Sequence, residues 1–192
     1  MNTAEKIAGA YLRLNGFLLL PQFTVFLGGS HGHVDWVGLR AAGSKEVGVN
    51  MPFPTDDKFF EAIPKDICAE PRDTLLGLVA EVKTNDELDR PKADQVEYIR
   101  NFLGEATVIE VAFSESRNPP AWPNGCMEIG NGYALKWIID RIRWMDENHD
   151  RGLTKLGSWT LSEDTLADFL VLHRYGAFKQ AEPVAKADCG DK

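Results

Sequence analysis

The sequence predicts an α/β domain in which helices pack around a mixed central sheet. Apolar, strand-like runs at residues 17–27, 33–40, 76–83 and 107–113 are separated by segments with helical periodicity. The order of elements is helix, strands, helix, strand and helices, which is typical of a mixed sheet flanked by helices. Of the 192 residues, 44% are hydrophobic and 26% are charged, so the chain has enough apolar material for a core.

The N-terminal elements follow from spacing and from turn residues. The first helix is predicted at residues 3–15 because apolar residues recur there at helical spacing, and Gly16 suits its C-terminal end. In the strand that follows, Pro21 predicts a break or an edge position, because proline cannot donate to a sheet ladder. Residues 28–33 have the glycines of a turn and lead into the strand at 33–40, after which we expect a hairpin extension.

The middle of the chain continues with shorter elements. Residues 55–63 predict a short helix that Thr55 caps. The run at 76–83 predicts a buried strand, and a helix that ends at Gly104 separates it from the strand at 107–113.

The domain organisation is expected to be simple. We predict a single domain over residues 1–180, with a core at about 3–113 and a C-terminal helical elaboration at about 131–177. The elaboration contains two amphipathic patterns, of which the second covers residues 161–176. The tail at 181–192 is small and polar and is predicted to be disordered.

Composition excludes some classes of protein. The net charge of −8 argues against a protein that coats nucleic acid nonspecifically, because such binding needs a basic face. It does not exclude a metal site, because metal ligands are themselves acidic. No apolar run approaches the ~20 residues of a membrane-spanning helix, so no membrane partner is expected. The three cysteines are far apart and odd in number, which favours a reducing, cytoplasmic setting.

Charged residues interrupt two of the apolar strands. Glu81 and Lys83 share one face of the strand at 76–83, roughly 7 Å apart. Taken alone, this pair could be a surface salt bridge on a half-exposed strand. However, Asp35 lies in the strand-like run at 33–40, where aspartate is a poor strand former.

Two carboxylates and a lysine within apolar strands predict a divalent-cation site. Carboxylate oxygens suit Mg²⁺, or Mn²⁺ in its place, and the remaining oxygens come from water and phosphate. Such a cation neutralises charge on a phosphate and acidifies a bound water. A lysine at the same centre can orient that water or stabilise developing negative charge.

Asp35 followed by Glu81-Val82-Lys83 resembles the motif of the PD-(D/E)xK phosphodiesterase superfamily, the fold of restriction endonucleases and archaeal Holliday junction resolvases. The predicted α-β-β-β-α-β order over about residues 3–113 is similar to the core of that family. The resemblance implies a restriction-endonuclease-like fold and a metal-dependent nuclease. In such an enzyme Asp35 and Glu81 would bind the metal, and Lys83 would position or activate the attacking water.

Two further residues enter through the resemblance. Family members often bear a glutamate on the first helix, and Glu5 matches that position, so it would assist in binding the metal. Gln95 resembles a glutamine of the helicase-associated exonuclease subgroup, which has a tyrosine four residues on, whereas Tyr98 is three residues on. Gln95 would orient the site or touch a phosphate. Without the resemblance, Glu5 could be a first-turn acid that favours the helix dipole, and Gln95 a solvated helix residue.

Two histidines precede the Asp35 strand. His31 and His33 could suggest a zinc site, but no further cysteine or histidine lies at a suitable spacing. A hairpin turn that leads into the strand explains them better. His33 shares a strand face with Asp35 and could approach the site.

The expected function is metal-dependent hydrolysis of phosphodiester bonds, with DNA as the expected substrate. An alternative is a catalytically silent nuclease-fold module that binds a protein partner in a DNA-processing or defence assembly, which the acidic net charge favours. A third interpretation is a plain α/β binding domain with a chance motif. A homodimer would suit cleavage of two strands, by analogy at the level of the fold.

Overall fold

The structure is a computed structural model, and the residues that it describes are 2–27, 30–43, 47–48, 51–52, 55–84 and 90–148. The chain divides into two compact units, Met1–Ile138 and Ile139–Lys192. The sheet and the candidate site belong to the first unit. The predicted helix at 161–176 and the predicted tail at 181–192 lie outside the described residues.

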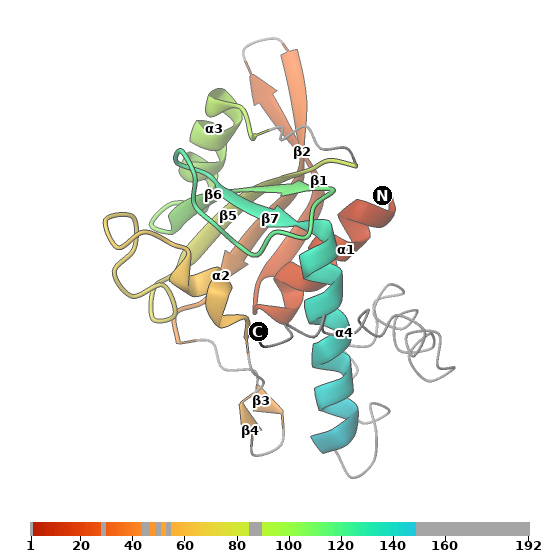
Figure 1. Ribbon diagram of the computed structural model, residues 1–192. Coiled ribbons are helices and arrows are strands. Elements are labelled where there is room, and N and C mark those ends of the chain that lie inside the picture. Colours follow the sequence, from red (N-terminus) through yellow and green to blue (C-terminus); the bar gives the residue numbers. More distant parts are fainter. Residues whose placement is uncertain are drawn as a thin grey trace, which may run out of the picture. The chain divides into compact units, whose positions relative to one another are not determined.

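A five-stranded mixed sheet forms the centre of the first unit (Figure 1). In spatial order its strands are β1 (Leu18–Leu27), β2 (Ser30–Arg40), β5 (Leu76–Val82), β6 (Thr107–Ser114) and β7 (Met127–Gly130). The β1, β2 and β5 strands pair antiparallel, whereas β6 is parallel to β5 and β7 is parallel to β6. The predicted α/β class with a mixed sheet is therefore confirmed. A separate two-stranded ladder joins β3 (Val47–Gly48) to β4 (Met51–Pro52), where the hairpin extension was expected.

Two helices cover opposite faces of the sheet. The described helices are α1 (Thr3–Leu14), α2 (Asp57–Glu61), α3 (Ala93–Leu103) and α4 (Asn131–Asn148). Val37 of β2 packs in one apolar cluster with Val96 and Ile99 of α3. The next residue towards the N-terminus, Trp36, lies against Gly9 of α1. Because neighbouring strand residues face opposite sides, α1 and α3 lie on opposite faces (Figure 1).

The β5 strand is the most deeply buried part of the sheet near the candidate site. Every residue of β5 except Glu81 is buried, and the second half of β6 beside it is buried as well. The predicted buried strand is thus confirmed, and Glu81 is the half-exposed carboxylate at its end. No helix in the described part of the chain is long and apolar enough to cross a membrane.

Two local features differ from the sequence-based predictions. The short strand β7 was missed, because four residues are too few to show an alternating pattern. Thr55 is not the cap of the short helix. That helix begins at Asp57, and Asp56 caps it by accepting the backbone N–H of Lys58 at 3.1 Å. Asp56 offers a carboxylate to the free N–H groups of the first turn, as the preferred capping residues do.

Gly9→Ala is expected to destabilise the protein by roughly 1–3 kcal/mol, because overpacking of a core costs that much. A Cβ on Gly9 would lie 2.5 Å from Cζ2 of Trp36, which is buried. Intrinsic helix propensity alone predicts the opposite sign, a gain of about 1 kcal/mol. Urea denaturation measures the free energy of unfolding and shows whether the change is a loss or a gain.

The matched control for Gly9→Ala is the same change in a Trp36→Phe background. The smaller ring removes the edge that the new methyl group meets, so the loss caused by Gly9→Ala should shrink. An equal loss in both backgrounds would mean that contact with the Trp36 ring is not the cause.

Candidate functional site

The candidate site lies where β2 separates from β5. The ladder between the two strands ends at the pair Trp36↔Ala80, and Asp35 is the next residue of β2. The Asp35 side chain accepts the backbone N–H of Val82, with 2.7 Å between Oδ2 and the nitrogen. The carboxylate thus takes the place that a main-chain ladder partner would occupy, which explains how an aspartate fits in this strand.

Both strands of the β1–β2 hairpin are distorted at this point. Val34 and Val37 belong to one apolar cluster, although residues three apart on a regular strand face opposite sides. On β1, the ladder with β2 skips Gln22, which lies opposite Asp35 and has a φ of 50°. A positive φ is uncommon outside glycine. The distortion therefore coincides with the residue whose carboxylate reaches β5.

The same hydrogen bond brings Asp35 and Glu81 together. The N–H of Val82 belongs to the peptide group that follows Glu81, so the Asp35 carboxylate lies beside the main chain of Glu81. Continuing the β2–β5 register by one pair also places Asp35 opposite Glu81. Neighbouring strands are about 4.8 Å apart. The two residues thus occupy adjacent points of adjacent strands, which is one condition for binding a shared cation.

The main chain of Lys83 is held on both sides. Its N–H donates to the carbonyl of Phe113 on β6 at 2.9 Å, and its carbonyl accepts from Nδ2 of Asn131 at 3.2 Å. Asn131 is the first residue of α4 and is buried. Lys83 therefore has a fixed backbone at the edge where the parallel strands β5, β6 and β7 end. This edge is where α/β sheets commonly place their sites.

Glu5 lies in the first turn of α1 and takes part in its cap. Its backbone N–H donates to Oδ1 of Asn2, and its side chain accepts from the backbone N–H of Asn2, which forms a capping box. Gln22 Nε2 also donates to Glu5 Oε2 at 3.3 Å, and Trp36 Nε1 donates to the Glu5 carbonyl at 3.2 Å. The turn that carries Glu5 is thus tied to the part of the hairpin where Asp35 lies, with Gln22 between them.

Gln95 connects the first turn of α3 to β2. Its Nε2 donates to the carbonyl of His33 at 3.2 Å, and its Oε1 accepts the backbone N–H of Lys92 at 3.1 Å. The side chain is only 4% exposed, and a Cβ on Gly32 would lie 2.7 Å from its Nε2. The amide therefore bridges the start of α3 and β2. This placement suits orientation of the strand that carries Asp35.

The donor set fits a hard divalent cation. Mg²⁺ is commonly bound through one or two carboxylates and takes its other oxygens from water and phosphate. The Val82 N–H engages one oxygen of Asp35, which leaves the second oxygen for a cation. Within the described ranges, no group of three or more His, Cys, Asp or Glu is gathered as a metal site. The structure thus offers carboxylates on two adjacent strands, and Glu5 is hydrogen-bonded to Gln22, which lies opposite Asp35 on the next strand.

A buried polar cluster was not predicted. Asp56 is 4% exposed and accepts hydrogen bonds from the hydroxyls of Tyr11, at 2.6 Å, and Tyr133, at 2.9 Å. Its backbone N–H donates to Oδ1 of Asn15 at 2.8 Å. Burial, followed by the charge of Asp56, raises the pKa of both tyrosines, so their hydroxyls remain donors. The cluster links the start of α2 to α1 and to the beginning of α4.

Comparison of the chain with protein-family models, with curated proteins and with solved structures finds no match. An assignment of function therefore rests on the residues and on their geometry.

Proposed function

We propose that the protein is a Mg²⁺-dependent nuclease that hydrolyses phosphodiester bonds and that its substrate is DNA. One observation carries the proposal: the Asp35 carboxylate crosses from β2 to the peptide group between Glu81 and Val82. Carboxylates from two neighbouring strands, with Lys83 two residues beyond, form a suitable set for metal-assisted attack on a phosphate.

The topology supports a restriction-endonuclease-like core. The elements α1, β1, β2, β5, α3 and β6 follow the α-β-β-β-α-β order that the resemblance implies. The two-stranded ladder and α2 lie between β2 and β5 in the chain. They account for the long sequence separation between Asp35 and Glu81.

Each residue of the proposed site has a role that follows from its place. Asp35 and Glu81 would hold Mg²⁺ or Mn²⁺, which would supply charge neutralisation and a more acidic water. Lys83 orients the attacking water or donates to developing negative charge. Gln95 positions β2 through the His33 carbonyl, and Glu5 would assist in binding the metal.

Cleavage of supercoiled plasmid and of labelled single-stranded DNA tests the proposal. We expect cleavage with Mg²⁺ or Mn²⁺ and none with EDTA. Glu81→Gln should cut at least about 100-fold more slowly, because it removes one of the two carboxylates that hold the cation. Glu110→Gln is the matched control, since Glu110 is a half-buried glutamate on the neighbouring strand β6. Glu81→Gln cutting as fast as Glu110→Gln, or wild type failing to cut with either metal, would contradict the proposal.

The alternative of a silent, protein-binding module has one observation in its favour. The β1 strand lies at one end of the strand order, and its Leu18 and Leu20 are exposed, Leu18 by 79%. Apolar side chains on an edge strand suit a contact with another protein or with a second copy. In that case wild type would cut no DNA with any metal, and Leu18→Ser would change its association in sedimentation experiments.

A further inference from the structure

The β1–β2 hairpin has two different faces beyond the point where β2 leaves β5. On one face, Phe23, Val25 and Val34 pack in or against the apolar cluster that includes residues of α3. The other face is defined by two cross-strand pairs, Thr24↔His33 and Phe26↔His31. We call these four residues the outer hairpin face.

Contacts join three of the four side chains, and Phe26 shares their face through its pairing with His31. Thr24 Oγ1 and His33 Nδ1 are 3.1 Å apart, and the rings of His31 and His33 meet edge to face with centroids 5.8 Å apart. Both histidines are exposed, and Phe26 is 70% exposed. A phenylalanine this exposed gains little from burial within the described residues, so its ring is available for a partner.

The chemistry of this face fits unpaired nucleobases. Proteins that bind single strands stack bases on aromatic rings, including histidine, and place cations along the phosphates. A base within a duplex is already stacked and cannot lie on a side chain unless the duplex opens. A phenylalanine beside two imidazoles therefore favours a single strand over a duplex.

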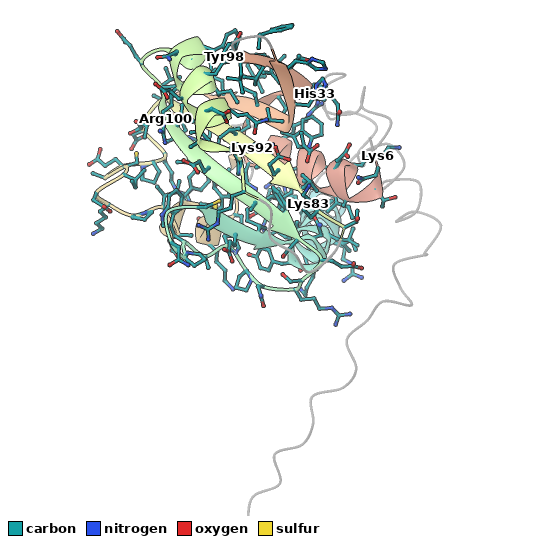
Figure 2. The ribbon with its side chains drawn as sticks, turned by 90° about the horizontal axis from the view of Figure 1, so that it is seen from above. Lys6, His33, Lys83, Lys92, Tyr98 and Arg100 are labelled. Carbon is teal, nitrogen blue, oxygen red and sulfur yellow. The ribbon has the colours of Figure 1, made fainter. Side chains whose placement is uncertain are left out.

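Two lysines, Lys6 and Lys83, lie on the side of the unit that carries the outer hairpin face (Figure 2). Lys6 is exposed and follows Glu5, and the Glu5 side chain accepts a hydrogen bond from Gln22 of the hairpin. Seen from above, Lys6, His33 and Lys83 lie towards one side of the unit, whereas Tyr98 and Arg100 lie towards the other (Figure 2). The phosphates of a strand on the outer hairpin face would thus meet positive charge near the carboxylates, despite the acidic net charge of the chain.

We propose that the outer hairpin face, with Lys6, binds the unpaired strand of a nucleic acid substrate and leads it to Asp35 and Glu81. This inference rests on the proposed nuclease function and specifies its substrate class as single-stranded. His31 lies four residues from Asp35 on β2, which is roughly 13 Å along the strand. That length corresponds to roughly four stacked nucleotide steps, so Phe26 contacts bases several positions from the scissile phosphate.

The test separates binding from chemistry. Fluorescence anisotropy in EDTA measures the affinity of the whole chain for labelled oligothymidylate and for a blunt duplex of equal length. We expect tighter binding of the single strand. Phe26→Ala should weaken it roughly 5- to 100-fold, which is the loss of one stacked base. Phe102→Ala is the matched control, because Phe102 is 55% exposed and contacts Phe23, on the other face.

A small substrate, thymidine 5′-(p-nitrophenyl phosphate), reports on the chemistry with Mg²⁺ because it cannot reach Phe26. Its hydrolysis should be unchanged in Phe26→Ala and lost in Glu81→Gln. The inference is overturned if wild type binds the duplex as well as the single strand, if it binds neither, or if Phe102→Ala weakens binding as much as Phe26→Ala. Loss of small-substrate hydrolysis in Phe26→Ala would also overturn it, because the ring would then support the site itself.

The two experiments distinguish failure of the proposed nuclease function from failure of the proposed single-strand binding. If wild type does not hydrolyse the small substrate but still binds single strands through Phe26, then the outer hairpin face is a binding platform and the proposed chemistry is wrong. If hydrolysis depends on Glu81 but Phe26→Ala binds the single strand as tightly as wild type, then the proposed function stands and this inference fails.

Discussion

Asp35→Asn is expected to lower the rate of metal-dependent DNA cleavage by roughly 1,000-fold while changing the free energy of unfolding by less than about 1 kcal/mol. The asparagine Oδ1 can still accept the Val82 N–H, which Asp35 Oδ2 accepts at 2.7 Å. Only the negative charge is removed, and that charge is what the proposed cation would need. Loss of activity without loss of stability is thus the signature of a metal ligand.

Asp35→Ala provides the contrast. It removes the charge and also the acceptor, so the N–H of Val82 loses its partner at a residue that is 5% exposed. An unsatisfied buried donor costs about 1–3 kcal/mol. We therefore expect Asp35→Ala to be inactive and less stable, as measured by urea denaturation beside the cleavage assay. Asp66→Asn, at an exposed position away from the strands, should match wild type in both measurements.

The two outcomes that contradict this account are distinct. Near-normal cleavage by Asp35→Asn would show that the carboxylate is needed only for its hydrogen bond to β5. A large loss of stability in Asp35→Asn would show that the charge itself holds the strands together, and activity could then not be interpreted.

Long and strongly patterned elements could be predicted from the sequence. The strands at 76–83 and 107–113 and the helix ending before Gly104 agree with β5, β6 and α3 to within a residue at these bounds. Continuous apolar runs and 3.6-residue spacing define such elements without help from the rest of the chain. The four residues of β7 have no such pattern, and their pairing with β6 depends on a partner that lies far away in the sequence.

The geometry at Asp35 shows why the candidate site was only partly predictable. Strand spacing correctly suggested that Asp35 and Glu81 lie on strands, but regular alternation would place Val34 and Val37 on opposite faces. They share a cluster, and the distortion involves a positive φ at Gln22, a residue type that gives no warning of it. The break expected at Pro21, one residue before, was the only local signal.

The Asp56 cluster was missed for a different reason. Its members are far apart in the chain, since Asp56 contacts Tyr11 and Tyr133 through hydrogen bonds between distant segments. Taken alone, Asp56 is an acid at the start of a helix, and nothing in its local sequence pairs it with two tyrosines. Their convergence depends on how the end of α1 and the beginnings of α2 and α4 pack together, which local spacing does not determine.

Asp56→Ala is expected to lower the free energy of unfolding by roughly 4 kcal/mol, more than any other single substitution considered for stability. The carboxylate accepts two tyrosine hydroxyls, and hydrogen bonds to charged groups contribute about 1.5–3 kcal/mol each. It also accepts the backbone N–H of Lys58, and loss of such a cap costs about 0.5–2 kcal/mol. The cost of burying the charge offsets part of this sum.

Two substitutions make the stability test of Asp56 specific. Asp57→Ala removes the neighbouring acid, which forms an exposed ion pair with Arg72, and should cost less than about 1 kcal/mol. Asp56→Asn keeps an oxygen for the Lys58 N–H but loses the charge that both tyrosines meet, so it should fall between the other two. Urea denaturation of the three variants gives the order. If Asp56→Ala cost no more than Asp57→Ala, the hydroxyls of Tyr11 and Tyr133 would have other acceptors, and packing of their rings alone would join α1 to the first turn of α4.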